Sequence, residues 1–557
     1  MKGRFIAAFL LPAVVLTLPF LLRRTDNALS DYLEDADTLV IISAHSEPMK
    51  FEWEHKFRKY YKEKYNRNII IDWRAPGGTS DIVRYIADRY EAEFRHFWES
   101  DPSNPPWNAN IASAFANPNV LRDPKADEEA KNARKKFLNS NVGIGIDLFA
   151  GGGTYDQSRH ARNGFAVDGG LHQRHPEYFR DDVIPREFGG DQIYEKNGKY
   201  YGVCLSSFGI CYNEDRLKDL RKYSLPGVSP SPTGDYAVAP PKRWRDLGKA
   251  EYFNAVIAAD PTKSGSANKC FEIILQQAMH EAVTPRNAPK PDPAMLDNGW
   301  ADGMNLIKRI IANTRTITDS AGKVTRDVAA GSGAVGMAID FYGLTEQEWN
   351  AFQTGGKPAI RYVAPEGGTS VSADPIQLMR GAPNLKQAHA FLDFIIGQEG
   401  QKLQNFKVGT PGGTVKYALR RSPVRKDLYA PEFKDFRADP DYYPYEAGLS
   451  FIYRGDWTGR YFSMIRILIR CVALDVQDEL RTAWKAIIAA GGPDKVPEAY
   501  RVFCKLPFAY HDAPKAAAGL RISRSRTAVE VAAMCRKWSQ DARDQYIKAA
   551  QLAAEGK

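Results

Sequence analysis

The residues best suited to chemistry are glycines, serines and threonines that follow apolar runs and precede helical patterns. The clearest case is "DPTKSGSANK", residues 260–269, which follows the apolar run 255–260 and precedes a helical pattern with Phe271, Ile274 and Leu275 on one face. The first N–H groups of a helix lack partners within the helix and carry the positive end of its dipole. Such a turn can bind an anion, or it can be an ordinary helix cap.

Similar turns recur along the chain, at the ends of predicted strands. Glycine allows backbone N–H groups to approach a ligand closely, and hydroxyl groups add further donors. The candidate ligand-binding residues are Ser43, His45, Gly78, Thr79, Ser80, Gly152, Gly153, Thr154, Ser206, Ser207, Ser264, Gly265, Ser266, Asp340 and Tyr342. Any single turn of this kind is more often a cap than a contact. The hypothesis therefore requires that the turns gather around one crevice.

The elements that must position these turns alternate between strand and helix. In the first part of the chain, apolar runs at 38–45, 69–75 and 142–156 predict strands, with helical patterns between them. This β-α-β-α-β order predicts an open parallel sheet covered by helices, and ligands of such sheets bind beyond the carboxyl ends of the strands. Further stretches at 200–214, 240–266, 331–343 and 362–379 indicate a second unit. An amphipathic helix is predicted after them, at 384–404.

The N-terminus carries an export pattern. Lys2 and Arg4 precede the uncharged apolar residues 5–22, and Arg23 and Arg24 follow them. A basic start with an apolar core is typical of a signal peptide, but this core is long enough to approach a membrane span. Residues 1–30 are therefore either a cleaved signal or a retained inner-membrane anchor. Both alternatives place the body of the chain outside the cytoplasm, in the periplasm or an equivalent compartment.

Composition narrows the possible classes. The chain has 557 residues, 43% hydrophobic and 26% charged, which is globular and long enough for two or more domains. A net charge of +9 without dense basic runs argues against nucleic-acid binding. Six cysteines include no C-x-x-C pair, so a zinc or redox site has little support. Cys504 with Cys535 is one possible disulfide, and buried free thiols are the alternative.

In their order, these segments resemble bacterial extracellular solute-binding proteins of ABC importers, in the type II branch that includes ferric-ion and phosphonate binders. The resemblance covers residues 38–404. It is carried by "IDLFAGGG", "GVCLSSFGICYN", "ADPTKSGSA", "GAVGMAIDFYG" and "APEGGTSVSADPIQL". It implies no enzymatic activity, no cofactor, a monomer, and two partners: a small-molecule solute and an inner-membrane ABC permease.

The resemblance also implies an α/β, two-lobed type II periplasmic-binding-protein fold. Each lobe is expected to be an open, mostly parallel sheet flanked by helices, and a mainly helical C-terminal extension goes beyond the family pattern. The expected division is 38–205 for the first part of lobe 1, 206–364 for lobe 2, 365–422 for the return to lobe 1 and 423–557 for the extension. The lobes would close on the solute like a hinged clamp.

The resemblance favours a phosphorylated or phosphonate solute. Ferric-binding relatives commonly present two adjacent tyrosines, whereas this chain has Phe341 and Tyr342 at the corresponding place. Iron remains the alternative, with Tyr342 as its ligand. Glu47, Asp156 and Asp340 would repel an anion if they faced the cleft, and a zwitterion would reconcile them with the anion-binding turns.

Two alternatives of other classes remain open. A hydrolase or another enzyme could be built on an α/β fold, but the chain lacks a phosphate-binding G-x-x-x-x-G-K-[ST] loop and a G-x-S-x-G elbow. The helical pattern at 527–555 could dock a partner instead of packing on a lobe.

Overall fold

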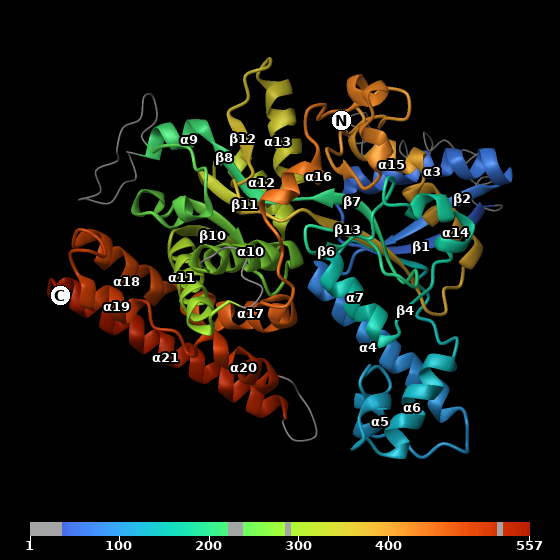
Figure 1. The fold of residues 1–557 in the computed structure, drawn as a ribbon, viewed down its shortest axis with the longest axis horizontal. Coiled ribbons are helices and arrows are strands. Elements are labelled where there is room, and N and C mark those ends of the chain that lie inside the picture. Colours follow the sequence, from blue (N-terminus) through green and yellow to red (C-terminus); the bar gives the residue numbers. More distant parts are fainter. Residues whose placement is uncertain (1–35, 221–237, 284–290, 521–526) are drawn as a thin grey trace, which may run out of the picture.

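The computed structural model describes residues 36–220, 238–283, 291–520 and 527–557, which form two lobes and a helical C-terminal extension (Figure 1). The predicted export segment, residues 1–30, lies outside the described residues. Within the described part of the chain, no helix is long and apolar enough to cross a membrane.

Lobe 1 is built on a mixed sheet with the strand order β14-β7-β13-β3-β1-β2, and β4 also pairs with β13. β1 is parallel to both β2 and β3, and a helix follows each of these three strands. The strands are β1 (Ala36–Ser43), β2 (Asn68–Arg74), β3 (Leu148–Ala150), β4 (Ala166–Val167), β7 (Tyr201–Ser206), β13 (Ser372–Met379) and β14 (Ser422–Pro423). The helices of this lobe are α3 (Glu47–Tyr65), α4 (Thr79–Glu99), α5 (Ala109–Ala114), α6 (Glu128–Asn139), α7 (Gly153–Asn163), α8 (Leu171–Arg174), α14 (Leu385–Ile396) and α15 (Gln398–Asn405).

Lobe 2 has a second mixed sheet, with the order β10-β9-β11-β8-β12. The strands β9, β10 and β11 run parallel, and a helix follows each of them. The strands are β8 (Phe208–Asn213), β9 (Val256–Ala259), β10 (Thr314–Thr318), β11 (Val335–Ile339) and β12 (Ile360–Val363). The helices are α9 (Glu214–Asp219), α10 (Gly265–Ala282), α11 (Pro293–Ala312), α12 (Ala321–Ala329) and α13 (Asp340–Gln353). The two-lobed α/β architecture expected from the sequence is confirmed.

The chain crosses between the lobes from β7 to β8 and returns from β12 to β13. Asp340, the first residue of α13, stabilises the crossing from β7 to β8. Its carboxylate accepts hydrogen bonds from the Ser207 N–H at 2.7 Å, the Ser207 hydroxyl at 3.1 Å and the Phe341 N–H at 2.7 Å. Burial raises the pKa of Asp340 to about 7, although these hydrogen bonds act in the opposite direction.

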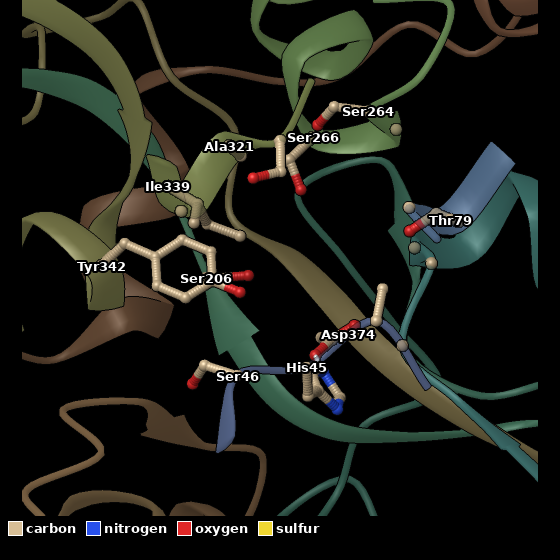
Figure 2. A pocket seen from close by; sticks show the side chains of 18 of the residues that line it. His45, Ser46, Thr79, Ser206, Ser264, Ser266, Ala321, Ile339, Tyr342 and Asp374 are labelled. Carbon is tan, nitrogen blue, oxygen red and sulfur yellow. Dashed lines mark hydrogen bonds and ion pairs between the residues drawn. The ribbon is translucent and has the colours of Figure 1, made fainter. Parts of the chain in front are cut away.

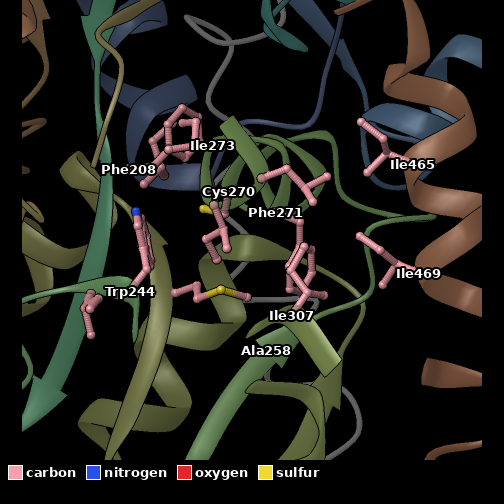
Figure 3. Close-up of a cluster of buried hydrophobic side chains, with 14 of the residues drawn as sticks. Phe208, Trp244, Ala258, Cys270, Phe271, Ile273, Ile307, Ile465 and Ile469 are labelled. Atoms are coloured by element: carbon pink, nitrogen blue, oxygen red, sulfur yellow. The ribbon is translucent and has the colours of Figure 1, made fainter. Parts of the chain in front are cut away.

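The helices of the extension from α17 onward pack on lobe 2 (orange to red in Figure 1), whereas Tyr445 of α16 contacts Phe188 of lobe 1. Its apolar side chains Ile465 and Ile469 face α10, in the same buried cluster as Phe271 and Ile307 (Figure 3). The long last helix, α21, packs against α18 and α19. The elements are α16 (Pro444–Ala447), α17 (Phe462–Ile469), a π-helical turn (Arg470–Leu474), α18 (Gln477–Ala489), α19 (Pro497–Phe503), α20 (Ala513–Gly519) and α21 (Ala528–Ala554).

The six cysteines are present as free thiols. The possible pairing of Cys504 with Cys535 is wrong, because the Cys535 side chain interacts with Cys471 on the π-helical turn, whereas Cys504 interacts with Tyr500.

We expect Tyr546 to reveal how firmly the extension is attached. This side chain is fully buried, its hydroxyl donates to the Val472 carbonyl at 2.7 Å, and the ammonium group of Lys308, on α11 of lobe 2, lies 5.3 Å from the centre of its ring. Tyr546→Ala should lower the free energy of unfolding by about 3–5 kcal/mol, as for other large aromatic truncations. Tyr546→Phe should lower it by only about 1 kcal/mol. Urea unfolding measures both, and an unchanged main transition in Tyr546→Ala would mean that the extension is only loosely attached.

Asp340 predicts a pH dependence of stability. The folded chain binds this proton more tightly than the unfolded chain, whose carboxyl has the ordinary pKa of 3.8. The contribution of this group to stability should therefore fall as pH rises from 3.8 towards about 7. Asp340→Asn should remove that fall, whereas Asp435→Asn, at an exposed position, should leave it. Urea midpoints at several pH values measure the slope, and parallel profiles for wild type and Asp340→Asn would contradict the assignment.

Candidate functional site

One cavity of about 950 Å³ lies between the lobes and is lined by both. Figure 2 shows side chains from opposite walls around it: Thr79, His45 and Asp374 come from lobe 1, and Ser264 and Tyr342 come from lobe 2. Its volume is near the upper end of the roughly 300–1,000 Å³ that small-molecule sites occupy. The cavity can hold an organic solute rather than only a bare ion.

Six helices of the described chain begin at this cavity, three from each lobe. Only α10 has an N-cap side chain that accepts an N–H of the first turn: the Ser264 hydroxyl accepts from Ala267 at 3.2 Å. The other N-cap side chains make no such bond. The helices are α3, α4 and α7 from lobe 1 and α10, α12 and α13 from lobe 2. Their first-turn N–H groups are donors that suit an anion, and an acidic residue in the first turn of four of these helices offsets part of the dipole.

The start of α7 shows why the sequence needs its three glycines. Gly151, Gly152 and Gly153 all have positive φ values, 94°, 96° and 74°. Residues other than glycine rarely adopt this backbone conformation. A Cβ on Gly152 would also lie 2.9 Å from Thr79 Cγ2, so the starts of α4 and α7 are in close contact.

Eleven of the fifteen residues predicted from the sequence line the cavity. They are His45, Gly78, Thr79, Gly152, Gly153, Thr154, Ser206, Ser264, Gly265, Ser266 and Tyr342. The turns that carry them lie far from one another in the sequence, and the structure brings them together at one crevice. Whether each touches a solute stays a prediction.

Four of the predicted residues do not line the cavity, because each one holds a neighbouring element instead. The Ser43 hydroxyl accepts from the His45 N–H at 3.1 Å, and the Ser80 hydroxyl accepts from Arg466 at 2.9 Å. Ser207 and Asp340 bind each other at the crossing between the lobes.

The floor of the cavity contains a buried charged group of three side chains. His45 Nε2 donates to Asp374 Oδ2 at 2.8 Å, and the fully buried Arg421 donates to the same oxygen. Burial opposes ionisation of Asp374, but His45 and Arg421 hold its pKa below the usual value. Burial also lowers the pKa of His45. The carboxylate of Asp374 is therefore compensated by Arg421 and does not present a free negative charge to a solute.

The other charged side chains that line the cavity are paired on lobe 1 and mostly outside ion pairs on lobe 2. On lobe 1, Glu47 pairs with Lys50 at 2.8 Å and Asp81 pairs with Arg84. On lobe 2, four lining residues make no ion pair within the described part of the chain: Lys263, Arg326, Asp319 and Glu346. Lys269, also on lobe 2, pairs with Glu272 at 3.1 Å. The lobe 2 wall thus presents charges of both signs outside ion pairs, and Arg326 opposes the rise that burial causes in the pKa of Glu346.

Glu47, Asp156 and Asp340, which would repel an anion if they faced the cleft, lie in three different environments. Glu47 lines the cavity but is paired, and Asp340 faces the crossing between the lobes. Asp156 is buried outside the cavity lining. Burial raises its pKa to about 6, with Arg466 and Arg159 acting in the opposite direction.

Sequence reasoning missed the turn before α12 and the contribution of the extension. Ser320, Ala321 and Gly322 line the cavity at the start of α12. The signal was present, because "TDS" before a helical pattern is a typical N-terminal cap. Tyr155 and Phe462 also line the cavity, and no local pattern marks Phe462.

Metal ligation has limited support in the described residues. These residues contain no group of three or more His, Cys, Asp or Glu side chains that could hold a metal ion. Two tyrosines, Tyr155 and Tyr342, line the cavity, and burial raises the pKa of Tyr342 to about 12. A phenolate is thus harder to form at Tyr342 than at an exposed tyrosine.

Comparison with curated proteins gives distant relatives. The chain is 23% identical over 201 residues to the phosphoglycerate transport regulatory protein PgtC of Salmonella typhimurium, a match that covers 36% of this chain and 39% of that protein. An uncharacterized protein of Haemophilus influenzae is 24% identical over 258 residues, or 45% of this chain and 59% of the relative. The chain therefore spans only about two fifths to three fifths of these relatives.

Among solved structures, two similar chains are periplasmic or ferric binding proteins. The periplasmic binding protein AfuA from Actinobacillus pleuropneumoniae, with fructose-6-phosphate bound, is 19% identical, and the match covers 74% of this chain and 95% of that one with a TM-score of 0.43. The ferric binding protein from Campylobacter jejuni is 16% identical, with coverages of 77% and 98% and a TM-score of 0.42.

A family model provides the assignment. Residues 177–424 match the model described as "Bacterial extracellular solute-binding protein", and this region includes all of lobe 2, both crossings and the strands β7, β13 and β14 of lobe 1. This match assigns an extracellular solute-binding domain to that part of the chain, in agreement with the resemblance seen in the sequence.

Proposed function

We propose that the protein captures a phosphorylated or phosphonate solute, anionic or zwitterionic, in the cleft between its lobes and delivers it to an ABC permease. The observation that carries this proposal is the convergence of six helix N-termini on one cavity. A phosphoryl group offers several acceptor oxygens to N–H donors that arrive from different directions. The matched family consists of binding proteins, so the proposal includes no catalytic step.

The free charges of lobe 2 favour a solute with groups of both signs. Lys263 and Arg326 can bind phosphoryl oxygens, and Asp319 and Glu346 can bind an ammonium or hydroxyl group of the same molecule. The distant relative PgtC is named for phosphoglycerate transport, which is compatible with a small phosphorylated organic solute.

A ferric ion fits this cavity less well. Six helix starts give a positive field, which opposes a trivalent cation. The hydroxyl of Tyr155 lies 3.1 Å from Ser463 Oγ, so it is already engaged, and only Tyr342 remains as the tyrosine ligand considered from the sequence.

Delivery to a permease requires a location outside the cytoplasm. The match to an extracellular family supports this location, and the apolar residues 5–22 predict the route to it. This segment is either cleaved after export or keeps the protein at the membrane. The mass of the exported protein distinguishes the two alternatives.

The test is a binding panel on the exported form after unfolding, washing and refolding. The panel contains inorganic phosphate, 3-phosphoglycerate, glucose 6-phosphate, 2-aminoethylphosphonate and ferric citrate. Thermal shift and calorimetry should give saturable micromolar or tighter binding for at least one phosphoryl or phosphonate compound. Stoichiometric iron binding without binding of any phosphorus compound would overturn the proposed solute class.

Lys263 and Arg326 should contribute to affinity without contributing to stability. Both side chains are exposed and form no ion pair in the described structure. A hydrogen bond to a charged group contributes about 1.5–3 kcal/mol, so Lys263→Gln or Arg326→Gln should weaken solute binding about tenfold or more. Lys357→Gln, at an exposed position outside the cavity, is the control. Calorimetry measures the dissociation constants, and equal affinities in all variants would remove both residues from the site.

Gly78 should control closure. Its φ of −68° and ψ of 173° suit any residue, so alanine introduces no backbone strain. A Cβ at this position would lie 2.6 Å from the Lys263 carbonyl oxygen on the opposite lobe. Gly78→Ala should therefore weaken solute binding at least tenfold and leave the melting temperature of the solute-free protein almost unchanged.

The control for this substitution is Gly455→Ala, whose Cβ would make an ordinary contact of 3.5 Å. If Gly78→Ala binds solute as tightly as wild type, the closed contact between Gly78 and Lys263 plays no part in binding.

A further inference from the structure

The segment before and within α17 is fixed to lobe 2 by polar side chains on one face of α10. These side chains recur at every fourth residue, so they lie along a single stripe of the helix. The stripe consists of Asn268, Glu272, Gln276 and His280. Its members bind the segment 452–462: Asn268 donates to the Phe462 carbonyl at 2.9 Å, and Gln276 donates to the Arg454 carbonyl at 2.9 Å and accepts from the Arg454 N–H at 2.8 Å.

Glu272 is the central residue of this stripe. Its carboxylate is fully buried and accepts from the Thr458 hydroxyl at 2.7 Å and the Tyr453 hydroxyl at 2.8 Å. Lys269 pairs with the same carboxylate at 3.1 Å. Together with the apolar contact of Ile465 and Ile469 (Figure 3), these bonds attach α17 to lobe 2. The Tyr453 N–H also donates to the Gly189 carbonyl of lobe 1 at 2.8 Å, so the segment before α17 contacts both lobes.

The same helix also reaches lobe 1. Arg466 Nη1 donates to the Ser80 hydroxyl at 2.9 Å, and Ser463 Oγ lies 3.1 Å from the Tyr155 hydroxyl. The rings of Tyr155 and Phe462 lie 4.7 Å apart. Ser80 and Tyr155 belong to the first turns of α4 and α7, two of the helices whose starts line the cavity.

A buried carboxylate completes this junction. Asp156, in the first turn of α7, has an oxygen without a hydrogen-bond partner among the described residues. Its other oxygen lies at the start of α10 on lobe 2, where a Cβ on Gly265 would be 3.7 Å away. Arg466 is one of the positive charges that act on this carboxylate. Loss of Arg466 would leave Asp156 with less compensation when the lobes are together.

We propose that α17 is a clasp carried by lobe 2, which holds the first turns of α4 and α7 against the closed cleft, with Arg466 and Ser463 as positioning residues for the solute site. The clasp rests on the proposed function, because its effect is on a solute bound between the lobes. Since most polar bonds of α17 and of the segment before it are to α10, we expect the contacts of α17 with Ser80 and Tyr155 to form on closure and break on opening. The extension therefore stabilises the closed state and slows solute release.

The experiment compares the full exported chain with Arg466→Gln, Arg466→Lys and the control Arg470→Gln, whose side chain on the following π-helical turn lies 3.5 Å from Asp475. The probes are 3-phosphoglycerate, glucose 6-phosphate and 2-aminoethylphosphonate. Stopped-flow fluorescence should show an approximately tenfold faster dissociation of the bound probe in Arg466→Gln, with an association rate constant within about twofold of wild type. Arg466→Lys should recover part of the loss, and Arg470→Gln should behave as wild type. Unchanged dissociation in Arg466→Gln overturns the proposal.

A second measurement separates the clasp from a general effect on folding. Gly78→Ala disfavours closure by another route, so Arg466→Gln in that background should add little to the loss of affinity. Additive effects would mean that Arg466 acts independently of closure, and would overturn the clasp.

A third measurement keeps the clasp testable if no probe binds, an outcome that contradicts the proposed solute class alone. Hydrogen exchange in the first turns of α4 and α7 of the solute-free chain should then be faster in Arg466→Gln than in wild type. When both proteins also carry Gly78→Ala, Arg466→Gln should cause no further increase. Equal exchange in wild type and Arg466→Gln would overturn the clasp.

Discussion

Backbone N–H groups at the starts of six helices meet at one cavity without cap side chains to satisfy most of them, and the rest of the cleft depends on this constraint. Such groups require a partner, which is water when the cleft is open and a ligand when it is closed. Three of the helices belong to each lobe, so neither lobe alone supplies the full set of donors. The fold thus supplies helix N-termini from both lobes, and lobe 2 adds side-chain charges of both signs.

Partners of the buried carboxylates limit the negative charge that reaches the cavity. Asp340 is held by Ser207 at the crossing between the lobes, and Asp374, on the floor of the cavity, is compensated by Arg421 and His45. Each of these carboxylates would repel an anion if it faced the cavity without a partner. Their partners lie far away in the sequence, which explains why the sequence alone raised an apparent conflict between acids and an anion site.

Local patterns predicted the turns, and only the fold could decide their use. The "AGGG" turn and the 260–269 turn were identifiable because glycine and hydroxyl residues separate an apolar run from a helical pattern. Ser80 and Ser43 have the same local pattern, yet long-range partners orient Ser80 away from the cavity, and a local backbone contact engages Ser43. The strand expected in 142–156 is reduced to β3, because only three residues pair with β1. Phe462 lacks any local signal, because its place at the cavity results from packing of the extension on α10.

Closure is the step at which the extension and the cavity act on each other. Observed affinity equals the intrinsic affinity of the closed form multiplied by the fraction of protein that is closed before solute arrives. Close approach of Gly78 to Lys263 leaves no room for a longer side chain, so closure brings backbone against backbone. Contacts of α17 with Ser80 and Tyr155 add stabilisation to that same state. An element outside the family's matched region can thereby change solute affinity without contributing a charge or a donor to the solute itself.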